Sequence, residues 1–236
     1  DRPALEKALS GVERVFVVTG HNPQLAEQQI NALEASKAVG AKLFIKVSSA
    51  KVLADPNSDS VVGRSHYAVE EAIRKSGLDW VILRPGLFMQ NTFQQAALIK
   101  AESKLVLPFA ADLPIAFIDV RDTGALGARV CLDPSTHVGK ELAFTGAASS
   151  YAEFATVLSE VIGKPVTYVA ASLERAEQAM RGGGFPDWLV AHLLAVAKIA
   201  ADGALSREVA QPIRGIVGRE PLTIRQFVED HKDMFV

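Results

Sequence analysis

Runs of large apolar residues alternate with amphipathic stretches through much of the chain. The run at residues 80–84 suits a strand that is buried on both faces, as in a parallel sheet, and Pro85-Gly86 ends it. Before it, residues 65–75 have the spacing of an amphipathic helix that ends at Ser76-Gly77. Ligands of open α/β sheets bind beyond the carboxyl ends of the strands, so residues 85–91 are the first candidate site.

The alternation continues on both sides of this unit and is typical of parallel βαβ layering in an α/β protein. Strands are predicted at residues 14–19, 42–48, 80–84, 115–120, 140–145 and 166–169. Helices are predicted at residues 3–9, 24–39, 65–75, 93–100, 121–132, 151–162, 173–181, 187–201 and 223–232. A boundary near Gly146 separates the strand-forming part from a smaller helical lobe.

Two features of the predicted lobe bear on binding. The helix at residues 187–201 is apolar on most faces, which indicates a helix buried within the chain or one that meets another chain in a homodimer. Glycines at 182–184 form a flexible break beside Phe185 and Trp188. These two aromatic residues either line a hydrophobic substrate pocket with a mobile lip or belong to the core of the lobe.

Composition narrows the class of protein. The sequence has 236 residues, of which 49% are hydrophobic and 22% charged, and a formal net charge of -2. This balance argues against a nucleic-acid or anionic-membrane surface, and the apolar runs are too short for a membrane span. The one cysteine, Cys131, excludes an internal disulfide and is predicted to be a buried core residue. The histidines lack metal-ligand spacing, so we predict no metal site, and we expect a cytoplasmic globular protein.

Short motifs in a fixed order carry a family resemblance. They are residues 11–19 (GVERVFVVT), 46–49 (KVSS), 70–71 (EE) with 76–78 (SGL), 83–86 (LRPG) with 88–91 (FMQN), 117–122 (FIDVRD), 144–146 (FTG) with 150–154 (SYAEF), and 225–229 (RQFVE). In this order they resemble the NmrA-like family, atypical members of the extended short-chain dehydrogenase/reductase superfamily. The resemblance extends over nearly the whole chain.

The resemblance implies a Rossmann-like parallel sheet at residues 1–146, which binds NADP or NAD with NADP preferred, and a mainly helical substrate lobe at residues 147–236. The implied function is NAD(P)H-dependent reduction of a small apolar carbonyl, quinone or enone. Two alternatives stay open: a non-catalytic regulator that senses NADP(H), and an interaction module without a cofactor.

The sequence departs from the family in two places. The family's N-terminal strand and glycine-rich phosphate loop are missing, so we expect a longer parent protein and weak dinucleotide binding by this piece alone. The superfamily's Tyr-x-x-x-Lys pair is also missing, since its lysine position falls on His66 and its tyrosine position on Val62. Tyr67 points about 100° away from His66 on a helix. This departure disfavours an alcohol dehydrogenase and is compatible with quinone or enone reduction, or with sensing.

The resemblance also implies site residues, each with a structural alternative. His66 supplies a proton or binds the nicotinamide ribose, unless it is a half-exposed helical histidine, and Ser49 orients a substrate carbonyl, unless it only forms a turn. Asp122 is predicted to cap a helix. The expected cofactor residues are Thr19, Gly20, Val47, Ser48, His66, Pro85, Gly86 and Phe88, and the expected substrate residues are Asn91, Phe185 and Trp188.

Overall fold

The computed structural model describes residues 1–146, 148–205 and 212–236, so residues 147 and 206–211 of the predicted lobe lie outside the described residues. Its largest sheet is entirely parallel and has the order β1-β2-β3-β7. The strands are β1 (Arg14–Val17), β2 (Leu43–Val47), β3 (Asp79–Pro85) and β7 (Lys140–Phe144). This sheet confirms the predicted α/β fold.

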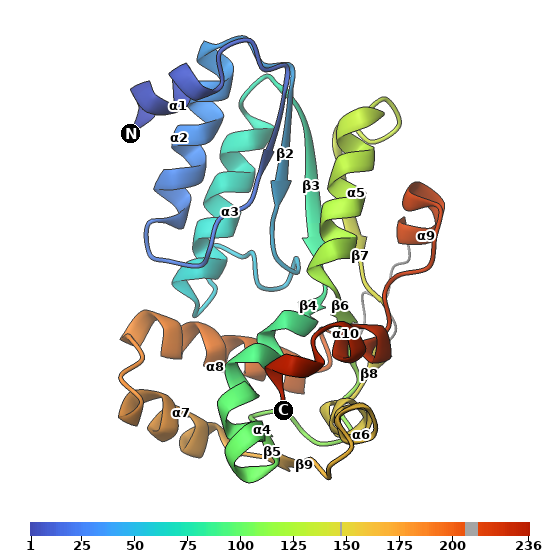
Figure 1. The fold of residues 1–236 in the computed structure, drawn as a ribbon. Coiled ribbons are helices and arrows are strands. Elements are labelled where there is room, and N and C mark those ends of the chain that lie inside the picture. Colours follow the sequence, from blue (N-terminus) through green and yellow to red (C-terminus); the bar gives the residue numbers. More distant parts are fainter. Residues whose placement is uncertain (147, 206–211) are drawn as a thin grey trace.

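Helices cover both faces of the sheet (Figure 1). One face packs against α2 (Leu25–Ala38) and α3 (Val61–Arg74), and the other against α5 (Val120–Leu132). Alternate residues of a strand point to opposite faces, so Leu43 and Ile45 of β2 join the core beneath α5, whereas Phe44 joins the core beneath α2 and α3. The same alternation directs Lys46 toward α3.

The strand predicted at 115–120 exists but lies outside the main sheet. It is β6 (Ile115–Ile118), which pairs with β4 (Leu87–Phe88) and β8 (Ala148–Ser149). A further pair joins β5 (Lys104–Leu107) to β9 (Thr167–Ala170). Residues 89–117 share a hydrophobic core with α6 (Tyr151–Ile162) and α10 (Ile224–Asp230), so this segment packs with the C-terminal helices. The division of the chain at residue 146 stays a prediction.

The remaining helical elements surround these sheets. They are α1 (Arg2–Ala8), η1 (Met89–Gln95), α4 (Ala96–Glu102), α7 (Leu173–Gly182), α8 (Asp187–Ala201), α9 (Pro212–Val217) and η2 (Lys232–Met234). Figure 1 shows α7 and α8 below the carboxyl end of the main sheet, beside α4. In the parts of the chain that the structure describes, no helix has both the length and the apolar character that a bilayer crossing needs.

Helix caps explain two differences from the sequence-based prediction. Helix α3 begins at Val61 because the side chain of Ser60 accepts the backbone N–H of Gly63. The expected cap at Asp122 is wrong, because the Asp119 carboxylate caps α5 by accepting the N–H of Arg121 at 2.8 Å. Asp122 is instead buried in the first turn, where it accepts the N–H of Leu222 at 2.9 Å.

Candidate active site

A cavity of about 980 Å³ lies beyond the carboxyl ends of β2 and β3. Ser48 and Ser49 follow β2 at its edge, and Pro85 and Gly86 stand where β3 ends. Apolar residues of α7 and α8 contribute to its lining, among them Met180, Leu189, Leu193 and Val196. Parallel strands place their carboxyl ends at one edge, which is why residues so distant in sequence meet here.

The structure brings together most of the residues predicted for the site. Eight of them line the cavity: Ser48, Ser49, Pro85, Gly86, Phe88, Asn91, Phe185 and Trp188. Four do not: Thr19, Gly20, Val47 and His66. Their roles at the cofactor, like those of the eight, stay predictions.

The four residues outside the cavity wall have other surroundings. Thr19 lines a separate hollow beside β1, and its hydroxyl accepts a hydrogen bond of 2.8 Å from Gln29. Gly20 accepts a hydrogen bond from the Asn22 side chain through its carbonyl. Val47 packs into the core beneath α5. After the end of β1, His21 lines the cavity, whereas the predicted Thr19 and Gly20 do not.

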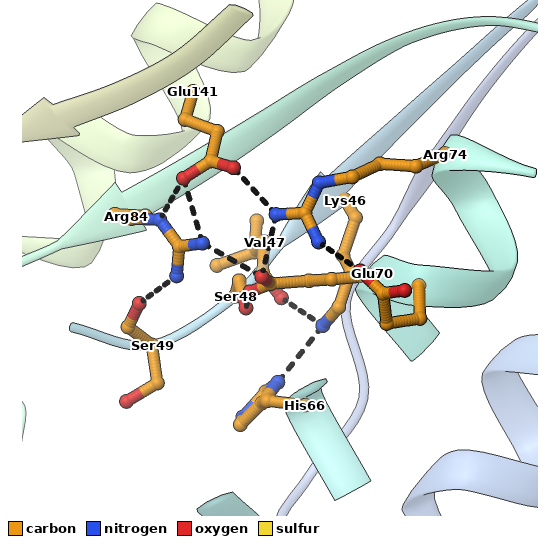
Figure 2. A network of polar contacts seen from close by, with 10 residues as sticks. Lys46, Val47, Ser48, Ser49, His66, Glu70, Arg74, Arg84 and Glu141 are labelled. Carbon is orange, nitrogen blue, oxygen red and sulfur yellow. Dashed lines mark hydrogen bonds and ion pairs between the residues drawn. The ribbon is translucent and has the colours of Figure 1, made fainter. Parts of the chain in front are cut away.

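A network of charged side chains joins β2, β3, β7 and α3 immediately behind the cavity (Figure 2). Arg84 is buried and donates hydrogen bonds to Glu70 at 2.7 Å and to Glu141 at 2.8 Å. It also donates to the backbone carbonyl of Ser49 at 2.9 Å. The buried pairs fix the end of β3 relative to α3, and the bond to Ser49 fixes the turn after β2.

The two serines of the turn have different roles in this network. The Ser48 hydroxyl donates its proton to a hydrogen bond of 2.5 Å with Glu70, so this proton is not available to a bound molecule. Ser49 is held through its backbone, and its hydroxyl makes no hydrogen bond within the described residues. Of the two, Ser49 is the hydroxyl available to a bound molecule.

His66 lies one layer deeper than the cavity wall. Only 3% of its surface is exposed, so the alternative of a half-exposed helical histidine is wrong. Its Nδ1 lies 2.8 Å from Nζ of Lys46, which is itself fully buried and also donates to the Val47 carbonyl at 3.2 Å. Burial, followed by the charge of Lys46, lowers the pKa of His66 well below its ordinary value.

Lys46 has an unusual titration. Burial disfavours the ammonium and lowers the pKa of Lys46 to about 7; the charge of Glu70 opposes this shift and that of Arg84 adds to it. Sequence analysis missed this residue, although a lysine inside a strand buried on both faces was a visible signal. His21 and His192 were also missed, and their separation in the sequence gave no sign that they share one cavity wall.

Gly86 serves the packing of the chain itself. A β-carbon at this position would lie 2.3 Å from the Ala116 carbonyl oxygen and 3.0 Å from Cγ2 of Thr145. Such distances are far inside normal contact, so only glycine lets the end of β3 pass this close to β6. The close approach at Gly86 is therefore one between two segments of the protein's own backbone.

A family model described as the NmrA-like family matches residues 1–224. The chain belongs to the NmrA-like family. This confirms the resemblance found in the sequence.

Individual relatives of this NmrA-like chain include several reductases. An NAD(P)H azoreductase of Xenophilus azovorans is 33% identical over 98% of this chain and 79% of its own length. A (4-alkanoyl-5-oxo-2,5-dihydrofuran-3-yl)methyl phosphate reductase of Streptomyces griseus is 29% identical over 100% of this chain and 81% of its own. The crystal structure of an NADPH-dependent quinone oxidoreductase from Escherichia coli, complexed with NADPH, superposes with a TM-score of 0.85 at 27% identity. The superposition covers 98% of this chain and 81% of the quinone oxidoreductase chain.

Proposed function

We propose that this protein is an NAD(P)H-dependent reductase of a small apolar carbonyl, quinone or enone compound. The observation that carries the proposal is the large cavity at the carboxyl ends of β2 and β3, whose walls are mostly apolar. The similarity to an NAD(P)H azoreductase and to an NADPH-dependent quinone oxidoreductase supports it. A cytoplasmic location is part of the same proposal and rests on sequence composition alone.

The described residues fit the nicotinamide half of a dinucleotide. A flat ring with one carboxamide needs apolar contacts and a few hydrogen-bonding groups, and Phe88, the Ser49 hydroxyl and the Asn91 amide offer these at one edge. Among the described residues the diphosphate half has no comparable cradle, because no glycine-rich turn joins one of their strands to a helix. NADP is preferred on the family resemblance.

Several residues of the chain act on the substrate in this proposal. Bound NAD(P)H supplies a hydride. The Ser49 hydroxyl donates a hydrogen bond to the substrate oxygen that gains negative charge, and Trp188 and Phe185 hold an apolar ring and exclude water. Val62, at the expected tyrosine position, is a fully buried aliphatic residue and cannot donate a proton. His66 is the nearby side chain that carries a transferable ring proton in this proposal.

Anaerobic stopped-flow kinetics with the full-length protein test the proposal. NADPH and a panel of quinones are mixed with the protein, and we expect oxidation of NADPH well above the background rate. The Ser49→Ala variant should lose about tenfold in kcat/KM, because one hydrogen bond to a charged oxygen is worth about 1.4 kcal/mol. Ser135→Ala, which removes an exposed hydroxyl bonded to Asp133, is the matched control. Absence of oxidation across the whole panel refutes the enzymatic proposal.

A second candidate is a regulator that binds NADP(H) and changes its protein partner without turnover. The buried Val62 favours it, because no phenol stands where active dehydrogenases have their proton donor. This candidate predicts measurable dinucleotide affinity, no turnover, and a partner in pull-down experiments. Calorimetry without heat from either NADP or NAD would instead favour a module that binds no cofactor.

A homodimer stays a prediction. The apolar residues of α8 that suggested it have other contacts in the structure. Val190 and Ala197 are buried within the chain, whereas Leu193 and Val196 line the cavity.

A further inference from the structure

Lys46 forms a buried pair with His66, and the reaction described above gives Lys46 no part. An ammonium group has only donors, so Lys46 donates to Nδ1 of His66 across 2.8 Å, and the ring proton of His66 then sits on Nε2. Nε2 is buried and has no hydrogen-bond partner among the described residues. A buried ring N–H without an acceptor is costly, which indicates that the group has a task other than holding the fold together.

Two further histidines connect this pair to the cavity. The ring of His21 stands edge-to-face at 5.9 Å from that of His66 and at 4.8 Å from that of His192, measured between centroids. His21 and His192 both line the cavity. His192 is fixed by a 2.8 Å hydrogen bond between its Nδ1 and the Ser60 hydroxyl, the cap of α3. Lys46, His66 and His21 thus lead from the core of the sheet to the cavity wall.

The surrounding charges leave the Lys46 proton transferable. Glu70 faces Lys46 from α3, but its carboxylate accepts hydrogen bonds from Ser48, Arg74 and Arg84. Arg84 of β3 disfavours additional positive charge at both Lys46 and His66. The Glu141 carboxylate of β7 accepts hydrogen bonds from Arg74 and Arg84.

The histidines hold less charge than the lysine. Burial, with a smaller contribution from the neighbouring His21, lowers the pKa of His192 to about 4. Burial and Lys46 lower the pKa of His21. Near neutral pH the group therefore holds its extra proton mainly on Lys46, with neutral imidazoles between it and the cavity.

We propose that Lys46, His66 and His21 form a proton relay that replaces the missing Tyr-x-x-x-Lys pair. The relay rests on the proposed reductase function. When hydride addition leaves negative charge on a substrate oxygen, an N–H of His21 gives that oxygen its proton. The Nε2–H of His66 replaces this proton on the other ring nitrogen of His21, and Lys46 gives a proton to Nδ1 of His66.

The step is balanced. Each imidazole loses one proton and gains one, Lys46 changes from ammonium to amine, and the reduced substrate becomes neutral. Water that enters the emptied cavity returns a proton along the same path. The ring separations require a small rotation or one bridging water between His66 and His21. His21 is the catalytic residue of this relay, and Lys46 is a positioning residue that acts through His66. In the described parts of the chain, these histidines belong to no group able to hold a metal ion.

Nuclear magnetic resonance of the cofactor-free protein tests the relay without any turnover. Lysine and histidine side chains are labelled with ¹⁵N and titrated through the neutral range. We expect Nζ of Lys46 to titrate near neutrality and the ring resonances of His66 and His21 to move with the same midpoint. Lys46→Met should abolish that shared midpoint, whereas Lys42→Met, at the exposed partner of Glu13, should leave it unchanged. An ordinary high midpoint for Lys46, or histidine rings that do not respond to it, overturns the relay.

The pH profile of kcat provides the second measurement. In the wild type, kcat should fall as pH rises through the titration of Lys46, because the amine form has no proton to pass on. Lys46→Met and His66→Gln should lower kcat at acidic pH by about a hundredfold and lose this limb, with KM little changed. A purely structural role predicts an unaltered limb and overturns the relay. If the wild type shows no turnover, the reductase proposal fails. The shared resonance midpoint of Lys46, His66 and His21 then decides alone whether these three side chains exchange a proton.

Discussion

Replacing Lys46 with methionine should change how stability depends on pH. The pKa of Lys46 falls from 10.5 for an ordinary lysine to about 7 in the folded protein, because the side chain is completely buried. Between these two values the unfolded chain holds one more proton than the folded chain, so the stability of the wild type rises as pH increases. Each pH unit above 7 adds about 1.4 kcal/mol, which gives about 3 kcal/mol between neutral pH and about pH 9.

The assay is urea denaturation of the wild type and the variant at several pH values across this range. Methionine has a similar volume and no charge, so Lys46→Met should lack this rise, whatever its absolute stability. The absolute value also contains the loss of the hydrogen bond to His66, which makes the slope the cleaner quantity. Lys42→Met, at the exposed surface pair with Glu13, should keep the slope of the wild type. Parallel curves for the wild type and Lys46→Met would refute the argument that burial depresses this lysine's pKa.

Three further predictions concern stability and use urea denaturation as the measurement. Gly86→Ala should cost about 3 kcal/mol, since the added carbon would meet a backbone oxygen at 2.3 Å, whereas Gly124→Ala on the exposed side of α5 should gain about 1 kcal/mol; equal effects would contradict the packing argument. Arg84→Met should cost about 4 kcal/mol by removing the buried guanidinium that lies 2.7 Å from the buried Glu70 carboxylate, and a loss no larger than that of the exposed Arg2→Met would be inconsistent with it. Ser150→Ala should cost about 1 kcal/mol by removing the capping box of α6, so an unchanged midpoint would show that the box contributes nothing.

Local sequence patterns were sufficient for the layered part of the fold. Strands β2 and β3 were visible because burial on both faces demands continuous apolar runs, and because proline and glycine end the second run. The helix between them, α3, was visible from its amphipathic spacing. The order of short motifs identified the family, and the rule that ligands bind at the carboxyl ends of parallel strands located Ser49, Pro85 and Gly86 at the cavity. The net charge of -2 also argued against a nucleic-acid-binding protein.

Other features depended on contacts between residues far apart in the sequence. Periodicity shows that a strand exists but not which partner it pairs with, so β6 was predicted without its place beside β4 and β8. The family resemblance placed the cap of α5 at Asp122, whereas the extended backbone at Asp119 makes that residue the cap. The apolar faces of α8 were ambiguous until the cavity showed what they contact.

By itself, the sequence determined most of the secondary structure, the family and the edge of the sheet where the cavity lies, because each of these follows from neighbours along the chain. Only the tertiary structure decided which polar groups share one environment. It placed Lys46 against His66, committed Ser48 to Glu70, and brought His21 and His192 to one wall. Burial and proximity in space set the protonation of such groups, and neither quantity is written in the local pattern of residues.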